Sequence, residues 1–318
     1  MLKILGDHYK INFFVSIYES GSDDNTKNIL RQFESYLNRF EIPNKIVLGD
    51  RKIDWAKSYR IEELAALRNK AIEPLLFPNN SNSERFDHIF FLNDVFNCPS
   101  DVLQLLIQHL FVQESDITCG VDWWWDFIVY DIWASKDMTG QLFRPYSIEK
   151  ASNHEDWPIE AGHEYSIQRI QKLLPYQQLS CWGGMVLLNA KPFYENNVKF
   201  RSHNNKTKEC AQSECFYISK DFWKAGYKKV IAIPTVISHY LWYGNQVLVR
   251  RLINERFKHI RSTWPDWENN EKLPNDKLVT KYPKSILCVS IAHELGANAE
   301  WKMELRTNST RENEGIFN

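Results

Sequence analysis

The amino-acid sequence predicts an α/β protein with a mostly parallel, twisted central sheet flanked by helices. Short apolar, β-rich runs alternate with segments whose apolar residues recur at helical spacing. Polar and acidic residues come directly after several of these runs. Such alternation is typical of parallel strands joined by right-handed crossovers, and ligands bind these sheets at the carboxyl ends of the strands.

The first part of the chain carries most of this alternation. We expect strands at residues 11–18, 45–48, 88–92 and 117–121, and helices at 25–40, 61–72 and 102–112. Pro74 limits the second helix, and Ser100 or Asp101 is the expected cap of the third. The polar stretch 77–85 is expected to be a surface loop.

The pattern weakens between residues 141 and 175 and then returns. A strand is expected at 181–189, a helix at 213–225 ended by Gly226, and short apolar runs lie at 230–233 and 236–241. The tail beyond Arg250 is polar, and its last ten residues or so are expected to be disordered.

Composition narrows the functional classes. The chain has 318 residues and a net charge of -1. Aromatic residues make up 14% of it, and 12 of them are Trp. Near-neutrality argues against a general nucleic-acid binder, which usually carries a basic excess. Aromatic faces pack cores, but they also stack on sugar rings and bases. The surplus therefore favours carbohydrate or nucleotide chemistry.

The sequence indicates no targeting segment and no cysteine-based metal site. No run approaches the roughly 18–20 apolar residues that span a bilayer, and residues 1–10 lack the apolar core of a signal peptide. None of the six cysteines forms a CxxC pair, so a zinc site has little support. Cys210 and Cys215 are close enough to pair, but two ordinary buried thiols are favoured.

Polar residues follow three successive predicted strands: Tyr18-Glu19, Asp50 and Asn93-Asp94. Each is a natural loop or cap when taken alone, but together they favour nucleotide binding. A carboxylate at the position of Asp94 can hold Mn²⁺ or Mg²⁺ against the diphosphate of an activated sugar, since these ions prefer oxygen ligands. The alternative is a helix cap, although Asp94 lies five residues early for that role.

Arg68 lies on the more apolar part of its predicted helix, beside Leu64 and Leu67. A guanidinium there requires an anionic partner, which a diphosphate would provide. Alternatively, the stem packs on the helix while the charged head reaches solvent.

Seven segments, taken in order over about residues 11–243, resemble the cryptococcal mannosyltransferase and capsule-associated protein family of fungi, glycosyltransferase family 69. They are YESGSDDNT (18–26), RIEELAALRNKAIEPL (60–75), FLNDVFNCPSDVLQLL (91–106), TCGVD (118–122), YDIWASKDMTG (130–140), CWGGMVLLNAKPF (181–193) and SECFYISKDFWKAGYKKVIAIPTV (213–236). The resemblance implies a GT-A fold and α-1,3 transfer of mannose from GDP-mannose, with retention and usually with Mn²⁺.

The resemblance also implies a donor site. Asp94 matches the last Asp of the GT-A metal motif, whereas Leu92 stands where another Asp is normal. His239, after the last core strand, matches a further metal ligand, although a lone His is more often structural. The donor-binding residues are expected to be Tyr18, Glu19, Asp50, Arg68, Asn93 and Asp137. Lys136 replaces the usual Arg of the segment that contains Asp131 and Asp137.

Catalysis and acceptor binding are assigned in the same way. Glu214 is expected to orient the acceptor hydroxyl together with Asp131, although Glu214 also suits the N-terminal charge of its helix. Trp124, in the run Trp123–Trp125, could stack on an acceptor sugar. The pair Gly183-Gly184 could admit substrate close to the backbone, and a plain β-bulge is the alternative.

We therefore expect a nucleotide-sugar-binding half (1–122), an acceptor-binding half (123–250) and a C-terminal extension (251–318). The expected partners are a nucleotide-sugar donor and a glycan acceptor, with no nucleic acid. A catalytically inactive glycan-binding protein and a nucleotidyltransferase are the alternatives. The family is normally anchored in the Golgi, whereas this sequence shows no signal or membrane segment, so a cytoplasmic or truncated form is also open.

Overall fold

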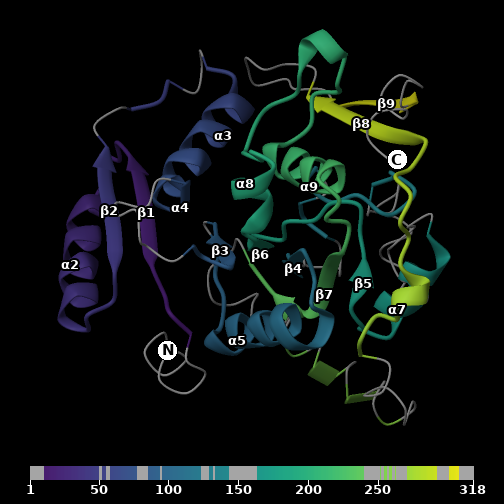
Figure 1. Cartoon of the computed structure of the whole chain (residues 1–318), viewed down its shortest axis with the longest axis horizontal. Helices are drawn as coiled ribbons and strands as arrows, with labels where there is room; N and C mark the ends of the chain where they lie inside the picture. The colour runs from purple at the N-terminus through teal and green to yellow at the C-terminus, as the bar shows by residue number, and fades with distance from the viewer. Residues whose placement is uncertain are drawn as a thin grey trace. The chain divides into compact units, whose positions relative to one another are not determined.

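The computed structural model describes residues 11–49, 52–54, 58–76, 85–93, 95–122, 129–131, 133–142, 163–239, 271–291 and 301–307, with single positions between 251 and 262. Two compact units make up the chain (Figure 1). The first comprises Met1–Phe86, Lys199–Ser202 and Ala292–Glu300, and the second comprises Asp87–Val198, His203–Ile291 and Trp301–Asn318. The division expected from the sequence, with a boundary after residue 122, stays a prediction.

The first unit contains a pair of parallel strands with helices. Its elements are β1 (Val15–Ser20), α2 (Thr26–Arg39), β2 (Asn44–Gly49), α3 (Arg60–Ala71) and α4 (Glu73–Leu76). Because Glu19 pairs with Leu48 and Ser20 with Gly49, the carboxyl ends of both strands lie at one edge. A hydrogen bond of 2.6 Å from the Ser16 hydroxyl to the Ala71 carbonyl ties α3 to β1.

The second unit holds a five-stranded sheet in the order β3-β6-β4-β7-β5. Its elements are β3 (His88–Leu92), α5 (Pro99–Ile107), the π-helix η1 (Gln108–Gln113), β4 (Ile117–Val121), α7 (Glu164–Gln171), β5 (Tyr176–Gln177), β6 (Met185–Asn189), α8 (Lys191–Glu195), η2 (Asn205–Thr207), α9 (Glu214–Lys224), β7 (Val230–Ile237), η4 (Asn275–Lys277), β8 (Ser285–Ile291) and β9 (Trp301–Thr307). Figure 1 shows α5 and α9 on different sides of these strands.

The α/β class is confirmed, but the expectation of a mostly parallel sheet is wrong for this unit. Only β4 and β7 pair in parallel, while β6 runs antiparallel to both β3 and β4, and β5 runs antiparallel to β7. Strands buried on both faces, such as β4 and β6, read as apolar runs in either direction. Their sequence therefore shows that a strand exists, but not which way it runs.

Several predicted boundaries need correction. The two short runs at 230–233 and 236–241 are one strand, β7, which ends at Ile237. Helix α5 begins at Pro99, and its N-cap is Cys98 instead of Ser100 or Asp101. Asp101 lies in the first turn and accepts a 3.1 Å hydrogen bond from the Cys98 amide, so its carboxylate still satisfies the helix start.

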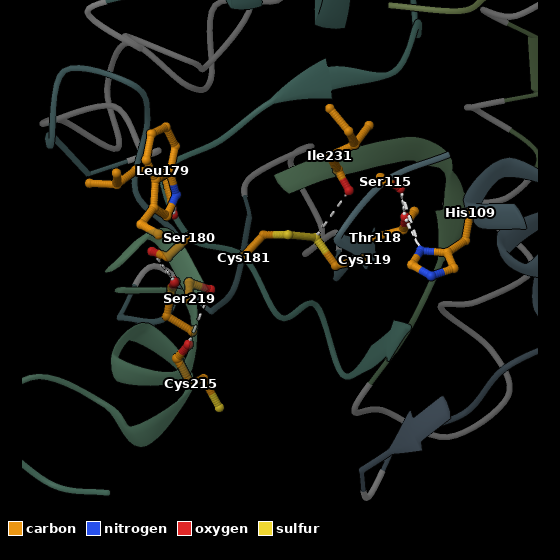
Figure 2. Close-up of a disulfide and its surroundings, with 12 residues drawn as sticks. His109, Ser115, Thr118, Cys119, Leu179, Ser180, Cys181, Cys215, Ser219 and Ile231 are labelled. Atoms are coloured by element: carbon orange, nitrogen blue, oxygen red, sulfur yellow. Dashed lines mark hydrogen bonds between the residues drawn. A yellow bond between two sulfur atoms is a disulfide. The ribbon is translucent and has the colours of Figure 1, made fainter. Parts of the chain in front are cut away.

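A disulfide joins Cys119 of β4 to Cys181, with the Cα atoms 6.2 Å apart (Figure 2). Both residues are buried, and the Cys119 sulfur lies 3.7 Å from the carbonyl oxygen of Ile231 on β7. Cys215 is buried and not disulfide-bonded, as expected, whereas Cys210 is disulfide-bonded and the expectation for it is wrong.

Residues 271–291 are part of the second unit. Gln177 exchanges hydrogen bonds of 3.0 and 2.8 Å with the main chain of Val279, and the amide of Leu273 donates to the Gln113 side chain at 3.0 Å. β8 and β9, which the sequence did not predict, form an antiparallel pair. Within the described residues, no helix is long and apolar enough to cross a bilayer.

Candidate functional site

At the strand-end edge of the first unit, Glu19 is buried inside β1 rather than following it, because the strand continues to Ser20. Its carboxylate accepts a hydrogen bond from the Ser22 amide and lies 4.0 Å from the Lys27 ammonium. Burial alone would raise the pKa of Glu19, but the Ser22 hydrogen bond and the Lys27 charge hold it below its usual value. An ionised carboxylate is therefore fixed at this edge.

Tyr18 lies next to Glu19 on β1, with the Lys70 ammonium 5.3 Å from its ring centre. An added Cβ at Gly49 would be 2.6 Å from the Glu19 carbonyl oxygen and 3.3 Å from the Tyr18 hydroxyl. Gly49 thus allows β2 to end close beside both predicted donor residues. Asp50, the next predicted residue, lies outside the described part of the chain.

Arg68 on α3 lies over the ring of Phe200, with its guanidinium carbon 5.6 Å from the ring centre. The neighbouring Asn69 side chain binds the Phe200 main chain twice, donating to its carbonyl at 2.8 Å and accepting from its amide at 3.0 Å. Sequence reasoning missed this amide clamp. It brings residues 199–202 into the first unit and gives Arg68 an aromatic surface.

In the second unit, the ends of β3, β4 and β7 meet at one edge. The Asn93 amide donates to the Gly184 carbonyl at 3.0 Å, and the Ser238 amide donates to the Val121 carbonyl at 3.2 Å. Phe96 and His239 pair through their main chains at 2.7 and 3.2 Å. Two predicted residues, Asn93 and His239, therefore sit on segments that the structure brings together.

The metal assignment stays a prediction. Asp94, its central residue, lies outside the described residues. His239 is buried at the strand-end edge and supplies an imidazole nitrogen. Across the described positions, no group of three His, Cys, Asp or Glu side chains is arranged to hold a metal ion.

Gly183 and Gly184 both have positive φ, of 58° and 71°, which glycine adopts readily. A Cβ on Gly183 would collide with the Gly120 carbonyl oxygen, and one on Gly184 would lie 2.5 Å from a methyl group of Val95. Both glycines therefore have a packing role: they let the chain before β6 lie close against β4 and against the segment that follows β3. Their contact with an acceptor stays a prediction.

Asp122 and Asp131 form a hydrogen-bonded pair at the end of β4, through the main-chain amide of Asp131. The Asp131 amide donates to Asp122 Oδ2 at 3.0 Å, and the Ala134 amide donates to Asp131 Oδ1 at 3.1 Å. Asp122 is buried, and burial together with the nearby Asp131 charge raises its pKa well above the usual range. Asp131 is partly exposed. The sequence selected Asp131 but missed its buried partner.

Asp137 is fully buried and organises its own loop. Its carboxylate accepts from the Thr139 amide at 3.0 Å, the Gln141 amide at 2.8 Å and the His163 amide at 3.2 Å. The Thr139 hydroxyl binds both carboxylate oxygens, at 2.8 and 2.9 Å. A loop-forming role is thereby observed, while direct contact with the donor stays a prediction.

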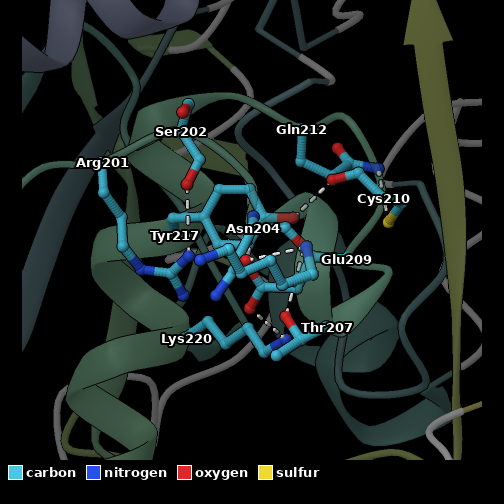
Figure 3. A network of polar contacts seen from close by, with 10 residues as sticks. Arg201, Ser202, Asn204, Thr207, Glu209, Cys210, Gln212, Tyr217 and Lys220 are labelled. Carbon is cyan, nitrogen blue, oxygen red and sulfur yellow. Dashed lines mark hydrogen bonds and ion pairs between the residues drawn. The ribbon is translucent and has the colours of Figure 1, made fainter.

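Glu214 is buried in the first turn of α9, whose N-cap Ser213 accepts a 3.1 Å hydrogen bond from the Phe216 amide. The preceding loop is fixed to the same helix by a buried ion pair, in which Lys220 Nζ lies 2.9 Å from Glu209 (Figure 3). The helix cap and the ion pair together fix the start of α9, and with it the position of Glu214. The helix-start role that the sequence allowed for Glu214 is therefore satisfied.

Of the aromatic residues, Trp124 and its neighbours Trp123 and Trp125 lie outside the described part of the chain. Trp182 and Trp223 are buried, and the Trp223 indole donates to the Leu179 carbonyl at 3.1 Å. Packing accounts for these two residues, so the sugar-stacking prediction concerns the undescribed cluster alone.

The profile of the family described as "Cryptococcal mannosyltransferase 1" matches residues 1–221. Alpha-1,3-mannosyltransferase CMT1 of Cryptococcus neoformans var. neoformans serotype D is 34% identical over 294 residues, which cover 86% of this chain. The chain spans 60% of the length of that relative. No solved structure matches the chain.

Proposed function

The chain belongs to the Cryptococcal mannosyltransferase 1 family, and from that premise we propose that it transfers mannose from GDP-mannose to a sugar hydroxyl. The proposed linkage is α-1,3 and the transfer retains the anomeric configuration. The observation that supports a site is the meeting of three strand ends in the second unit, where Asn93, His239 and the Asp122–Asp131 pair lie on connected segments. Strand ends of this kind are where α/β proteins bind ligands.

The described residues divide between donor and acceptor in this proposal. Tyr18, Glu19 and Arg68 bind the nucleotide in this proposal, together with Asp50. Arg68 offers a planar cation suited to phosphate oxygens. Asn93 and Asp137 are further donor-binding residues in this proposal, Asp137 through the loop that it organises.

Asp131 and Glu214 orient the acceptor hydroxyl in the proposal. In a retaining transfer the leaving phosphate itself can take the acceptor proton, so these carboxylates position the hydroxyl instead of removing its proton. Gly183, Gly184 and Trp124 would line the acceptor side. Electrostatic stabilisation of the departing diphosphate is then the main source of rate acceleration.

A divalent ion, Mn²⁺ or Mg²⁺, is proposed to be held by Asp94 and His239. The imidazole suits Mn²⁺, but the described donor set alone lacks the carboxylates such an ion prefers. The site therefore depends on Asp94. When bound, the ion would neutralise charge on the leaving diphosphate.

A donor screen by thermal shift, with and without Mn²⁺, tests the proposal. Stabilisation by GDP or GDP-mannose over UDP ligands is expected, since binding to the folded state raises the melting temperature. Hydrolysis of GDP-mannose that is lost in Asp94→Ala would exclude an inactive glycan-binding protein. No shift with any nucleotide would contradict the enzymatic proposal.

A further inference from the structure

Lys136 is a lysine in an unusual setting, because its side chain is fully buried. Its main chain is fixed to the neighbouring segment, where its amide donates to the Ser180 carbonyl at 2.9 Å and its carbonyl accepts from the Leu179 amide at 2.9 Å. Within the described part of the chain, its ammonium has no hydrogen-bond partner. A buried cation without such a partner lowers the stability of a fold.

The charges that act on this ammonium are the carboxylates of Asp131 and Asp137. Asp137 is occupied by its loop, since Thr139, Gln141 and the His163 amide already fill its oxygens. Asp131 is the partly exposed member of the Asp122–Asp131 pair. Of the two carboxylates, Asp131 is therefore the one whose ionisation depends more on the Lys136 charge.

Two further titratable groups stand around this cluster. Tyr176 on β5 is fully buried, and this burial raises its pKa well above the usual value, so it remains neutral. His163, the N-cap residue of α7, binds the Ser166 hydroxyl at 2.8 Å, and burial lowers its pKa. Neither supplies a second cation at neutral pH. Lys136 is therefore the cation of this cluster among the described side chains.

We propose that Lys136 is a positioning residue for the proposed transfer, whose ammonium keeps Asp131 ionised so that the proton of the Asp122–Asp131 pair stays on the buried Asp122. The inference rests on the proposed function, because Asp131 is an acceptor-orienting residue there. Two carboxylates that repel each other cannot both ionise readily in a dry site, and the Asp131 charge acts on the buried Asp122. A nearby cation decides which of them carries the charge.

The titration of Lys136 predicts how the turnover rate depends on pH. Burial, opposed in part by Asp131 and Asp137, lowers the pKa of Lys136 from 10.5 to about 7. Its charge is therefore present at mildly acidic pH and lost as the pH rises through the neutral range. A group that supports catalysis only when charged would make the turnover rate fall over that range.

The test compares Lys136→Met and Lys136→Arg with the wild-type chain in mannose transfer from GDP-mannose between pH 5.5 and about 9. In Lys136→Met, which removes the charge, we expect kcat to fall on the order of tenfold to a hundredfold with KM little changed. Lys136→Arg keeps the charge at every pH tested. It should move the alkaline fall of kcat to higher pH, and if it does not fold, Lys136→Met carries the test.

Stability is measured on the same proteins by urea unfolding. Met replaces a buried charge with an apolar chain of similar length, so Lys136→Met should be at least as stable as the wild type at pH 6. Lys220→Met is the matched control, because Lys220 is a buried lysine with a full partner in Glu209. That control should lose stability and leave the shape of the pH profile unchanged.

The outcomes separate the inference from the proposed function. Lower stability of Lys136→Met at pH 6, or an unchanged kcat and pH profile, would overturn the role of Lys136 while transfer by the wild type stands. Absence of transfer by the wild-type chain with any nucleotide sugar would overturn the proposed function, and the inference with it. A less active, more stable Lys136→Met and a shifted Lys136→Arg profile would support both.

Discussion

The main chains of Phe96 and His239 hydrogen-bond to each other twice, at 2.7 and 3.2 Å. This pairing fixes the segment after β3 beside the end of β7. It does not involve the imidazole, so the backbone arrangement and the proposed metal-binding role of His239 can be tested separately.

His239→Asn is expected to retain the Phe96 pairing and the fold, and to raise the Mn²⁺ concentration needed for half-maximal transfer about tenfold or more, since an imidazole ligand is lost. The measurement is the transfer rate against Mn²⁺ concentration. His203→Asn removes an imidazole elsewhere and should leave that concentration unchanged. An unchanged Mn²⁺ requirement in His239→Asn would remove this residue from the metal site.

Gly183→Ala is expected to destabilise the fold by about 2–4 kcal/mol, because the methyl group adds a clash with the Gly120 carbonyl to the strain of a positive φ. Gly226→Ala is the matched control. Its φ is 93°, but no atom lies within 4 Å of the added Cβ, so only the backbone cost of about 1 kcal/mol remains. Urea unfolding measures both, and equal losses would refute the packing role of Gly183.

The buried His109 predicts a specific sensitivity to acid. Its imidazole binds Thr118 at 2.7 Å and His88 at 2.9 Å, and burial lowers its pKa from 6.5 to about 3. Because the unfolded chain binds the proton more readily, stability from this group is full above pH 6.5 and is lost as the pH falls from 6.5 towards 3.

The size of that acid loss should be a few kcal/mol. It is read as the difference in unfolding free energy between the wild type and His109→Gln, measured from pH 3.5 to 7, because the difference cancels most of the carboxylate titrations. A constant difference over this range would mean that His109 does not titrate with the predicted sign. His203→Gln serves as the control with an imidazole outside the network.

The Cys119–Cys181 disulfide closes a long loop, with a sequence separation of 62. Replacing both cysteines with alanine should cost about 2–4 kcal/mol, by allowing the unfolded chain more conformations. Cys215→Ala, at a free buried thiol, should cost less. Thermal unfolding with and without reductant measures the effect, and a reductant-insensitive wild type would show that the disulfide is not a stabilising link.

The sequence predicted elements best where one strong pattern is bounded by polar residues. The predicted bounds of β3 and β4 match the observed ones. β9 was missed although WKMELRT alternates apolar and polar residues, because the segment was read as part of a polar tail. The direction of β6 could not be predicted, because it depends on the turn at Gly183 and on its long-range partners.

For the site, the sequence selected residue types that suit the chemistry but not their surroundings. Asn93 and His239 lie on segments that the structure joins. Asp137 was selected as a donor ligand, whereas its observed bonds are those of an Asx-type turn, which the following Thr139 and Gly140 could have indicated. The burial of Asp122 and Lys136 depends on the packing of segments far apart in the chain, so no local pattern could show it.

Mannose transfer itself tests the central claim most directly. The chain is incubated with GDP-mannose, a mannoside acceptor and Mn²⁺, while released GDP is quantified and the linkage of the product is determined by NMR. We predict GDP release matched by an α-1,3-mannosylated product, both abolished in Asp94→Ala. Release of pyrophosphate, or no product from any nucleotide sugar while the chain remains folded, would contradict the account.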